Sequence, residues 1–312
     1  MDNPRTIESA SADLMGQSTV RESSLLADIK SLIKVGIINS NLITTFAGFW
    51  LALYFTGSAF TDHWGSFVLT MLGTAFVIAG GCIINNWYDR DIDPIMSRTQ
   101  NRPTVTGTMS LTFVKALGIS VSIAGFLILM LTTVEAALWG AFGWFVYVVL
   151  YTMWSKRRYT INTVVGSFSG AVPPLIGWSA VDPGLQLEAF ILFLMMFIWQ
   201  TPHFLALAIK KKEEYQAAGI PMLPVVHGFA MTKRQIVIYV ACLLPLPIYL
   251  ASLGNVFLTI AFILSFGWLI LGIAGFFMKD DYKWATWMFI FSLNYLTIMF
   301  FAMVIVTLPL PF

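Results

Sequence analysis

The chain has 312 residues, of which 58% are apolar and only 11% are charged. Soluble globular domains carry about 25% charged residues, so this composition excludes a soluble protein and indicates one that crosses a membrane several times. The net charge of +2 says little about partners, and we expect no nucleic acid among them.

The N-terminal segment, residues 1–34, is polar and has no apolar core near Met1. This pattern argues against a cleaved signal peptide and predicts a mobile cytoplasmic tail. Residues 35–312 are predicted to form one all-α membrane domain. Apolar runs of about 20 residues predict nine transmembrane helices in it, at residues 37–56, 66–84, 110–132, 136–152, 161–180, 188–209, 235–253, 255–277 and 285–308.

The basic residues orient this predicted bundle in the membrane. If the N-terminus is cytoplasmic, all 18 lysines and arginines fall in or beside cytoplasmic segments, as the positive-inside rule describes. The C-terminus is then extracytoplasmic. Long loops rich in polar residues follow the second and sixth spans, and we expect them to face each other over one central cavity, because helix bundles build ligand sites from facing helices.

The first of these loops contains NNWYDRDIDPIMSRTQNRP, residues 85–103. Asn85, Asp89 and Asp93 are spaced four residues apart, so they form one stripe on a helix. We expect the second span to stay helical up to Asp93, where Pro94 ends it. Oxygen ligands of this kind suit Mg²⁺ bound together with substrate phosphates. The alternative is a solvated loop whose aspartates and arginines pair with one another.

Basic side chains near the stripe have a geometry that suits phosphate oxygens. Arg98 and Arg102 follow the aspartates, and Lys156 and Arg157 lie in the loop after the fourth span. The alternative for Lys156 and Arg157 is that they only determine topology. Asp91 points away from the stripe, and we assign it a lesser role.

The second long loop belongs to WQTPHFLALAIKKKEEYQAAGIPMLPVV, residues 199–226. His203 lies within an apolar helix, where a polar side chain indicates a functional site, although a purely structural hydrogen bond is the alternative. Lys211 and Glu214 belong to a segment of mixed charge that is a candidate part of the site. The alternative is that this segment only anchors the chain at the membrane interface.

Together these segments resemble a known family. NNWYDRDID is similar to the N(D/N)xxDxxxD motif of the UbiA superfamily of intramembrane prenyltransferases. With RTQNRP, KRRYTINTVVG and WQTPHF in this order, the chain resembles the protohaem IX farnesyltransferase branch of that superfamily. The resemblance implies a UbiA-like bundle of nine helices around a central cavity, in a bacterial cell membrane. It also implies transfer of the farnesyl group of farnesyl diphosphate to a vinyl group of haem b, with addition of water, to make haem O.

The resemblance assigns roles to individual residues. The catalytic and metal-binding positions are Asn85, Asp89 and Asp93, which would hold Mg²⁺ on the diphosphate. The diphosphate-binding positions are Arg98, Arg102, Lys156, Arg157 and Lys211. The second Asp-rich motif of the superfamily is altered here, since Lys211 and Tyr215 stand at its ends, and Glu214 remains as the candidate for a second acidic site. His203 would ligate the haem iron or orient the porphyrin.

Two other functions remain open from the sequence. A sister prenyltransferase that acts on a quinone-precursor aromatic shares the fold and the first motif. A non-catalytic transporter of haem or of an isoprenoid diphosphate is the alternative from another class of protein. If the chain is the haem-modifying enzyme, haem A synthase or a terminal oxidase assembly is the expected recipient of its product.

Overall fold

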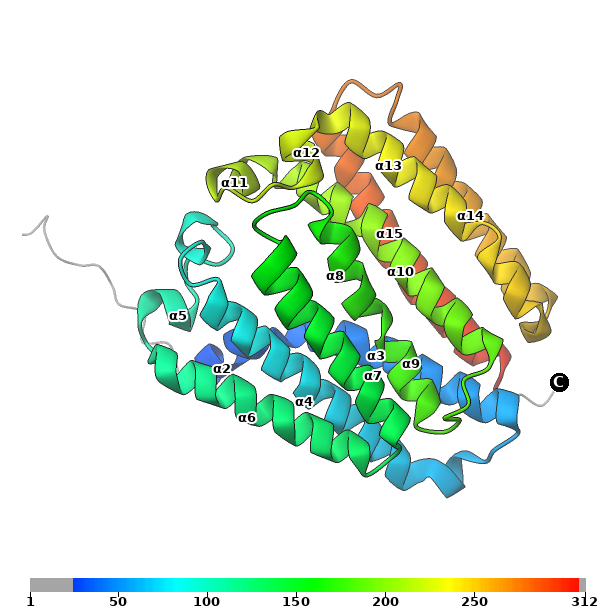
Figure 1. Ribbon diagram of the computed structural model, residues 1–312. Helices are drawn as coiled ribbons and strands as arrows, with labels where there is room; N and C mark the ends of the chain where they lie inside the picture. Colours follow the sequence, from blue (N-terminus) through cyan, green and yellow to red (C-terminus); the bar gives the residue numbers. More distant parts are fainter. Residues whose placement is uncertain (1–24, 309–312) are drawn as a thin grey trace, which may run out of the picture.

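The structure is a computed structural model that describes residues 25–308. Every regular element in this range is a helix (Figure 1). In chain order they are α2 (Leu25–Ile33), α3 (Val35–Thr56), η2 (Phe60–His63), α4 (Trp64–Tyr88), η3 (Asp93–Ile95), α5 (Pro103–Thr106), α6 (Leu111–Met130), α7 (Val134–Phe145), η4 (Val146–Ser155), α8 (Asn162–Ala171), α9 (Pro173–Ser179), α10 (Leu187–Lys210), α11 (Lys212–Ala217), α12 (Leu223–Val226), α13 (Gly228–Leu243), η5 (Leu246–Leu253), α14 (Asn255–Ala274) and α15 (Asp281–Val306).

Eight helical stretches within residues 25–308 are long and apolar enough to cross a membrane. They coincide with eight of the nine predicted spans, and the predicted all-α membrane fold is confirmed. The ninth predicted span, residues 161–180, consists of α8 and α9 in succession. Pro173 and Pro174 have no N–H to donate, which interrupts the helical hydrogen bonds there, although the backbone at Val172 stays helical (φ −71°, ψ −32°).

Helix α4 ends at Tyr88 and not, as predicted, at Asp93. Asp89 is its C-terminal cap, and Asp93 begins the short helix η3. The early end of the helix coincides with a tertiary contact between Asp91 and Arg157, which no local sequence pattern contains. The predicted stripe still survives, since the N–H of Asp89 donates to the carbonyl of Asn85 and the N–H of Asp93 donates to the carbonyl of Asp89, each at 2.9 Å.

Part of the predicted N-terminal tail is a packed helix. Residues 1–24 of that tail lie outside the described residues, but Leu25–Ile33 form α2. Leu32 is fully buried beside Ile83 and Val114, and the side-chain amide of Asn86 donates to the Leu32 carbonyl at 2.9 Å. The packed helical part of the chain therefore includes α2, which precedes the boundary expected at residue 35.

Helices α3 and α9 approach each other through glycines. A Cβ added at Gly48 would lie 2.1 Å from the Pro174 carbonyl oxygen, and one at Gly177 would lie 2.0 Å from the Thr45 carbonyl oxygen. Small residues permit such close contact between helices in a membrane. This contact holds the divided span α8–α9 against α3 and so closes one side of the bundle.

We expect Gly177→Ala to lower the free energy of unfolding by about 1–3 kcal/mol, the usual range for overpacking, because the backbones of α3 and α9 must separate. The matched control is Gly65→Ala, since a Cβ at Gly65 meets nothing within 4 Å. Thermal unfolding of both variants in detergent, followed by circular dichroism, measures the difference. Equal melting temperatures for the two variants would contradict the role given to this contact.

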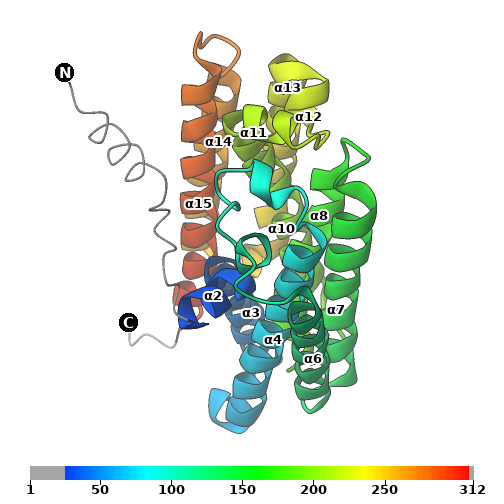
Figure 2. The same cartoon turned by 90° about the vertical axis from the view of Figure 1, so that its left-hand side faces the viewer.

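The two long loops meet at one end of the bundle. Figure 2 shows the segment between α4 and α6 lying beside α11. Ile92 and Met96 of the first loop pack with Ile220 and Met222 of the second in one buried apolar cluster, and the Ser97 hydroxyl donates to Glu214 Oε1 at 3.1 Å. The expected placement of the two loops over a shared cavity agrees with this packing.

Candidate functional site

A cavity of about 720 Å³ runs from the loop end into the bundle. Its charged lining residues are Lys30, Lys34, Asp93, Arg98, Arg102 and Lys156. Much of the remaining lining is aromatic or apolar and includes Trp144, Trp199, Phe204, Leu207, Leu293 and Leu296. A cavity with a cationic mouth and an apolar interior suits a ligand that has an anionic head and a hydrocarbon tail.

The acidic stripe lies at the mouth of this cavity and is withdrawn from solvent. Asn85, Asp89 and Asp93 are 3%, 0% and 2% exposed. The Asn85 amide donates to Asp89 Oδ2 at 2.8 Å and to the Thr152 hydroxyl at 3.1 Å. Burial raises the pKa of the Asp93 carboxyl, and the Arg102 guanidinium opposes that rise.

Each carboxylate of the stripe has a cationic partner. Lys156 Nζ donates to Asp89 Oδ2, and Arg102 Nη1 donates to Asp93 Oδ2 at 2.6 Å. Two of the predicted diphosphate-binding residues, Lys156 and Arg102, thus form hydrogen bonds with the predicted metal ligands. Buried carboxylates need such partners, because an unpaired buried charge is costly.

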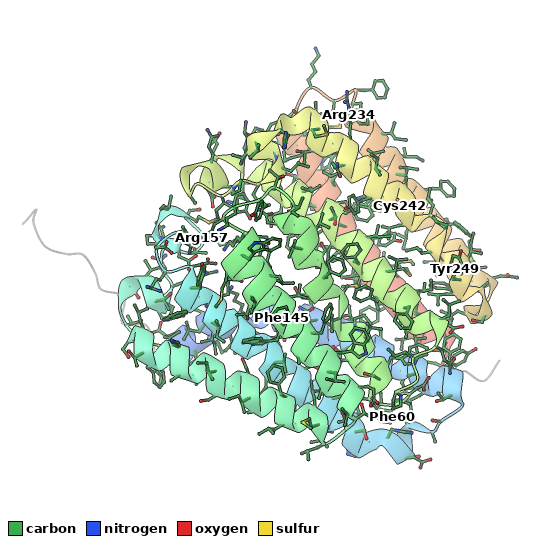
Figure 3. All side chains as sticks on the ribbon, viewed as in Figure 1. Phe60, Phe145, Arg157, Arg234, Cys242 and Tyr249 are labelled. Atoms are coloured by element: carbon green, nitrogen blue, oxygen red, sulfur yellow. The ribbon has the colours of Figure 1, made fainter. Side chains whose placement is uncertain are left out.

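Arg157 lies at the loop end of the bundle, where Figure 3 labels it. Its guanidinium donates to both oxygens of Asp91, at 2.6 and 2.7 Å, and reaches Asp89 Oδ1 at 3.4 Å. The hydrogen bonds to Asp91 raise the pKa of Arg157 and lower the pKa of Asp91. Arg157 is absent from the described cavity lining, so the structure places it behind the stripe and gives Asp91 a partner.

Arg98 and Tyr215 line the cavity from opposite loops. Burial raises the pKa of the Tyr215 hydroxyl, and the neighbouring Arg98 guanidinium opposes the rise. Arg98 itself is exposed, and in residues 25–308 it has no salt bridge to a carboxylate. It is therefore a cation that is available to an anionic ligand.

Lys211 and Glu214 occupy a different position. They pair with each other at 2.7 Å, and Glu214 also accepts from Ser97. Neither residue is among the described cavity lining. The structure thus does not bring this pair to the stripe, and its contacts connect the two long loops.

His203 lines the same cavity from α10. Its ring stacks against Trp199 and Phe289, with centroids 4.9 and 4.7 Å away. Its Nδ1 is 2.7 Å from the Ser292 hydroxyl, which donates its own hydrogen to the Phe289 carbonyl at 2.6 Å. When the Ser292 hydroxyl donates to that carbonyl, its oxygen accepts from Nδ1–H of His203, and in this tautomer Nε2 keeps a free lone pair.

The sequence did not lead us to predict a contact between Lys34 and the stripe, because Lys34 was counted only among the basic residues that set the membrane topology. Lys34 Nζ donates to Asn85 Oδ1 and lies 3.5 Å from the Tyr147 hydroxyl. Burial lowers the pKa of its ammonium to about 8. The one available signal was its position immediately before the first span, on the same membrane side as the acidic stripe.

The oxygen ligands fit a divalent cation that arrives with its substrate. Within residues 25–308, no three His, Cys, Asp or Glu side chains gather to form a metal site made of protein alone. Asp89 and Asp93 provide two carboxylates, and Asn85 adds an amide group. Mg²⁺ commonly takes one or two carboxylates and completes its shell with substrate phosphates and water, so this donor set suits a metal–diphosphate complex.

Comparison with known proteins agrees with this geometry. Residues 41–304 match the model of a family described as the UbiA prenyltransferase family. A protein of Geobacillus sp. (strain WCH70) named protoheme IX farnesyltransferase is 61% identical over 308 residues, which cover 99% of this chain and 100% of that protein. The protein of that name from Oceanobacillus iheyensis is 58% identical over 309 residues, 97% of this chain and 98% of its own. Protoheme IX farnesyltransferase 2 of Bacillus subtilis is 56% identical over 308 residues, 99% and 100% of the two chains.

Solved structures share the fold at low sequence identity. A digeranylgeranylglyceryl phosphate synthase superposes with a TM-score of 0.73 at 19% identity, over 91% of this chain and 99% of that one. A UbiA homolog from Archaeoglobus fulgidus, bound to GPP and Mg²⁺, superposes with a TM-score of 0.65 at 16% identity, over 89% and 99%. At these identities the likeness concerns the fold alone.

Proposed function

The chain belongs to the UbiA prenyltransferase family, and on that premise we propose that it transfers the farnesyl group of farnesyl diphosphate to a vinyl group of haem b. The observation that carries the proposal is one cavity with a cationic mouth beside the buried carboxylates Asp89 and Asp93 and with a largely apolar lining that includes His203. The relatives at 56–61% identity that are named protoheme IX farnesyltransferase support this choice of substrates.

The diphosphate binds at the stripe. Asn85, Asp89 and Asp93 would hold Mg²⁺, and the bound metal would neutralise part of the negative charge that grows on the leaving diphosphate. Lys156 and Arg102 lie on these carboxylates and can turn from them to phosphate oxygens. Arg98 adds a cation from the loop side. Once turned to the phosphate oxygens, these cations would stabilise the negative charge on the departing diphosphate.

The transfer breaks the bond between the farnesyl group and the diphosphate and forms a carbon–carbon bond to the vinyl group. The C1–O bond of farnesyl diphosphate breaks, and its electron pair leaves with the diphosphate oxygen. The π pair of the haem vinyl forms the new carbon–carbon bond to C1, which leaves a cation on the remaining vinyl carbon. A water oxygen bonds to that carbon and loses one proton. The product carries a hydroxyethylfarnesyl side chain, which is that of haem O.

The haem occupies the deeper, aromatic part of the cavity. His203 Nε2 has a free lone pair there, and Ser292 holds the ring in the required tautomer. We therefore assign His203 as the ligand of the haem iron, because neutral imidazole held by a hydrogen bond on its other nitrogen is a common metal ligand.

The membrane orientation follows from the loops. The cations and the stripe gather at the end formed by α5, α11 and α12, at the upper left of Figure 1, whereas α15 ends at the opposite side. With this loop end cytoplasmic, the start of α2 is cytoplasmic and the end of α15 is extracytoplasmic. The product would pass within the membrane to haem A synthase or to a terminal oxidase assembly.

A pigment assay tests the proposed function. The chain is expressed in bacterial membranes that contain haem b and farnesyl diphosphate, and the extracted haems are separated by reverse-phase chromatography with mass detection. We expect a more hydrophobic haem whose mass has increased by one farnesyl group and one hydroxyl group, because the added water loses a proton. Unmodified haem b from well-folded protein would contradict the proposal. Prenylation of a quinone-precursor aromatic instead would identify the sister activity, and binding of both substrates without product would identify a transporter.

A further inference from the structure

Lys34 stands at a conformationally unusual point of the chain. It separates α2 from α3 and adopts the left-handed conformation, with φ 54° and ψ 62°. Such backbone is uncommon for a residue with a side chain and concentrates at functional sites. The adjoining helix α2 is held to α4 through the buried Leu32, whose carbonyl accepts from Asn86. The left-handed turn therefore places the Lys34 side chain beside Asn85, which immediately precedes Asn86 in the sequence.

Among the described residues, the hydrogen-bond partners of the Lys34 ammonium are neutral. It donates to Asn85 Oδ1, and the Tyr147 hydroxyl lies 3.5 Å away. In the part of the chain that the structure describes, Lys34 forms no salt bridge with a carboxylate, whereas Lys156, Arg102 and Arg157 each have one. A cation that is withdrawn from water without a counter-ion is unfavourable, so this position favours an anion brought by a ligand.

The surroundings argue against the opposite role, in which Lys34 would neutralise a carboxylate of the protein itself. Asp89, whose charge attracts the Lys34 ammonium, is already bound by Lys156 and by the Asn85 amide. The described cavity lining contains five cations and one carboxylate, namely Lys30, Lys34, Arg98, Arg102 and Lys156 against Asp93. The mouth of the cavity is therefore positive before any substrate enters.

We propose that Lys34 binds an anionic oxygen of the substrate at the cavity mouth, delivered there by the α2–α3 turn. The inference rests on the proposed function, which offers two sources of such an oxygen: the diphosphate of the prenyl donor and a propionate of haem. The geometry favours the diphosphate, because the partner of Lys34 is Asn85, which lies on the stripe with Asp89 and Asp93. Lys34 then completes a ring of cations around the diphosphate with Lys156 and Arg102.

Direct binding measurements distinguish these sources. The variants are Lys34→Met, which keeps most of the side-chain volume, and Lys34→Arg, which keeps the charge. The control is Lys115→Met, because Lys115 is exposed on α6 and lies over the Trp87 ring outside the described cavity lining. The probes are inorganic pyrophosphate with Mg²⁺, farnesyl thiodiphosphate with Mg²⁺, and haem b followed by its absorption spectrum.

We expect Lys34→Met to weaken both diphosphate probes by about 10- to 100-fold, the range of one lost charge-assisted hydrogen bond, with unchanged haem affinity. Lys34→Arg should restore most of the binding, and Lys115→Met should bind as the unmodified chain does. Melting temperatures close to that of the unmodified chain would show that the variants are folded.

Three results would overturn the inference. A loss confined to haem would assign the anion to a propionate and reject the diphosphate. Unchanged affinity for all probes, or an equal loss of affinity for all of them, would show that Lys34 does not bind the substrate anion directly. Failure of the proposed function looks different: the unmodified chain would bind farnesyl thiodiphosphate, yet it would make no farnesylated haem from the natural substrates.

Discussion

Asp89→Asn will abolish farnesyl transfer, with a loss of about 10³-fold or more, while the protein still folds and inserts. Asp89 is the fully buried member of the stripe and is contacted by Asn85, Lys156 and Arg157. Removing one preorganised electrostatic group from an active site typically costs about 10²–10³-fold. Here the substitution also removes a carboxylate ligand of the metal, so we expect the upper end of that range or beyond.

The same pigment assay measures this loss, and Asp91→Asn provides the matched control. Asp91 lies two residues away, but it is exposed, and within residues 25–308 its one ion-pair partner is Arg157. An exposed ion pair is worth about 1 kcal/mol at most, so the control should lose less than about 5-fold. Near-normal turnover in Asp89→Asn would reject the metal–diphosphate assignment. A similar loss in both variants would point to the ion-pair network and not to one carboxylate.

The second large effect is expected at His203. His203→Phe keeps an aromatic ring between Trp199 and Phe289 but removes the Nε2 lone pair. We expect the spectrum of imidazole-ligated haem to disappear and haem b to bind about 10²-fold more weakly or worse, because even outer partners of metal ligands are worth about 10- to 100-fold. The affinity for pyrophosphate with Mg²⁺ should not change, since the stripe is a separate part of the cavity.

Ser292→Ala tests the tautomer that this assignment requires. The substitution removes the acceptor of the His203 Nδ1 proton and leaves the ligand itself in place. We expect haem affinity to fall by about 10-fold, the lower end of the range for an outer partner, with the imidazole-ligated spectrum retained. If His203→Phe kept that spectrum, the iron ligand would be another group, and His203 would only pack against the porphyrin.

Much of the fold was predictable, because its causes are local. A membrane span needs about 20 apolar residues, and the charged residues between spans mark their ends, so residues 188–209 and 255–277 already identified α10 and α14. The division of α8 from α9 is less visible, although Pro173 and Pro174 indicate it. The early end of α4 at Tyr88 was not predictable, since it accompanies the contact between Asp91 and Arg157.

The candidate site divides in the same way. Asn85, Asp89 and Asp93 could be found from their spacing, because residues four apart share one face and successive backbone hydrogen bonds keep them aligned. The partner of each cation could not be found. Lys156 and Arg157 are neighbours in the sequence, yet Lys156 lines the cavity and binds Asp89, whereas Arg157 turns to Asp91.

The sequence by itself determined the membrane class, eight of the spans and the shared face of Asn85, Asp89 and Asp93, since each depends on residues close together along the chain. Only the tertiary structure decided that Lys34 reaches Asn85, 51 residues away, and Tyr147, 113 residues away. It also decided that Ser292 orients His203 across 89 residues. Such choices depend on which of several equivalent polar groups the packed helices bring within about 3 Å, the distance at which hydrogen bonds form.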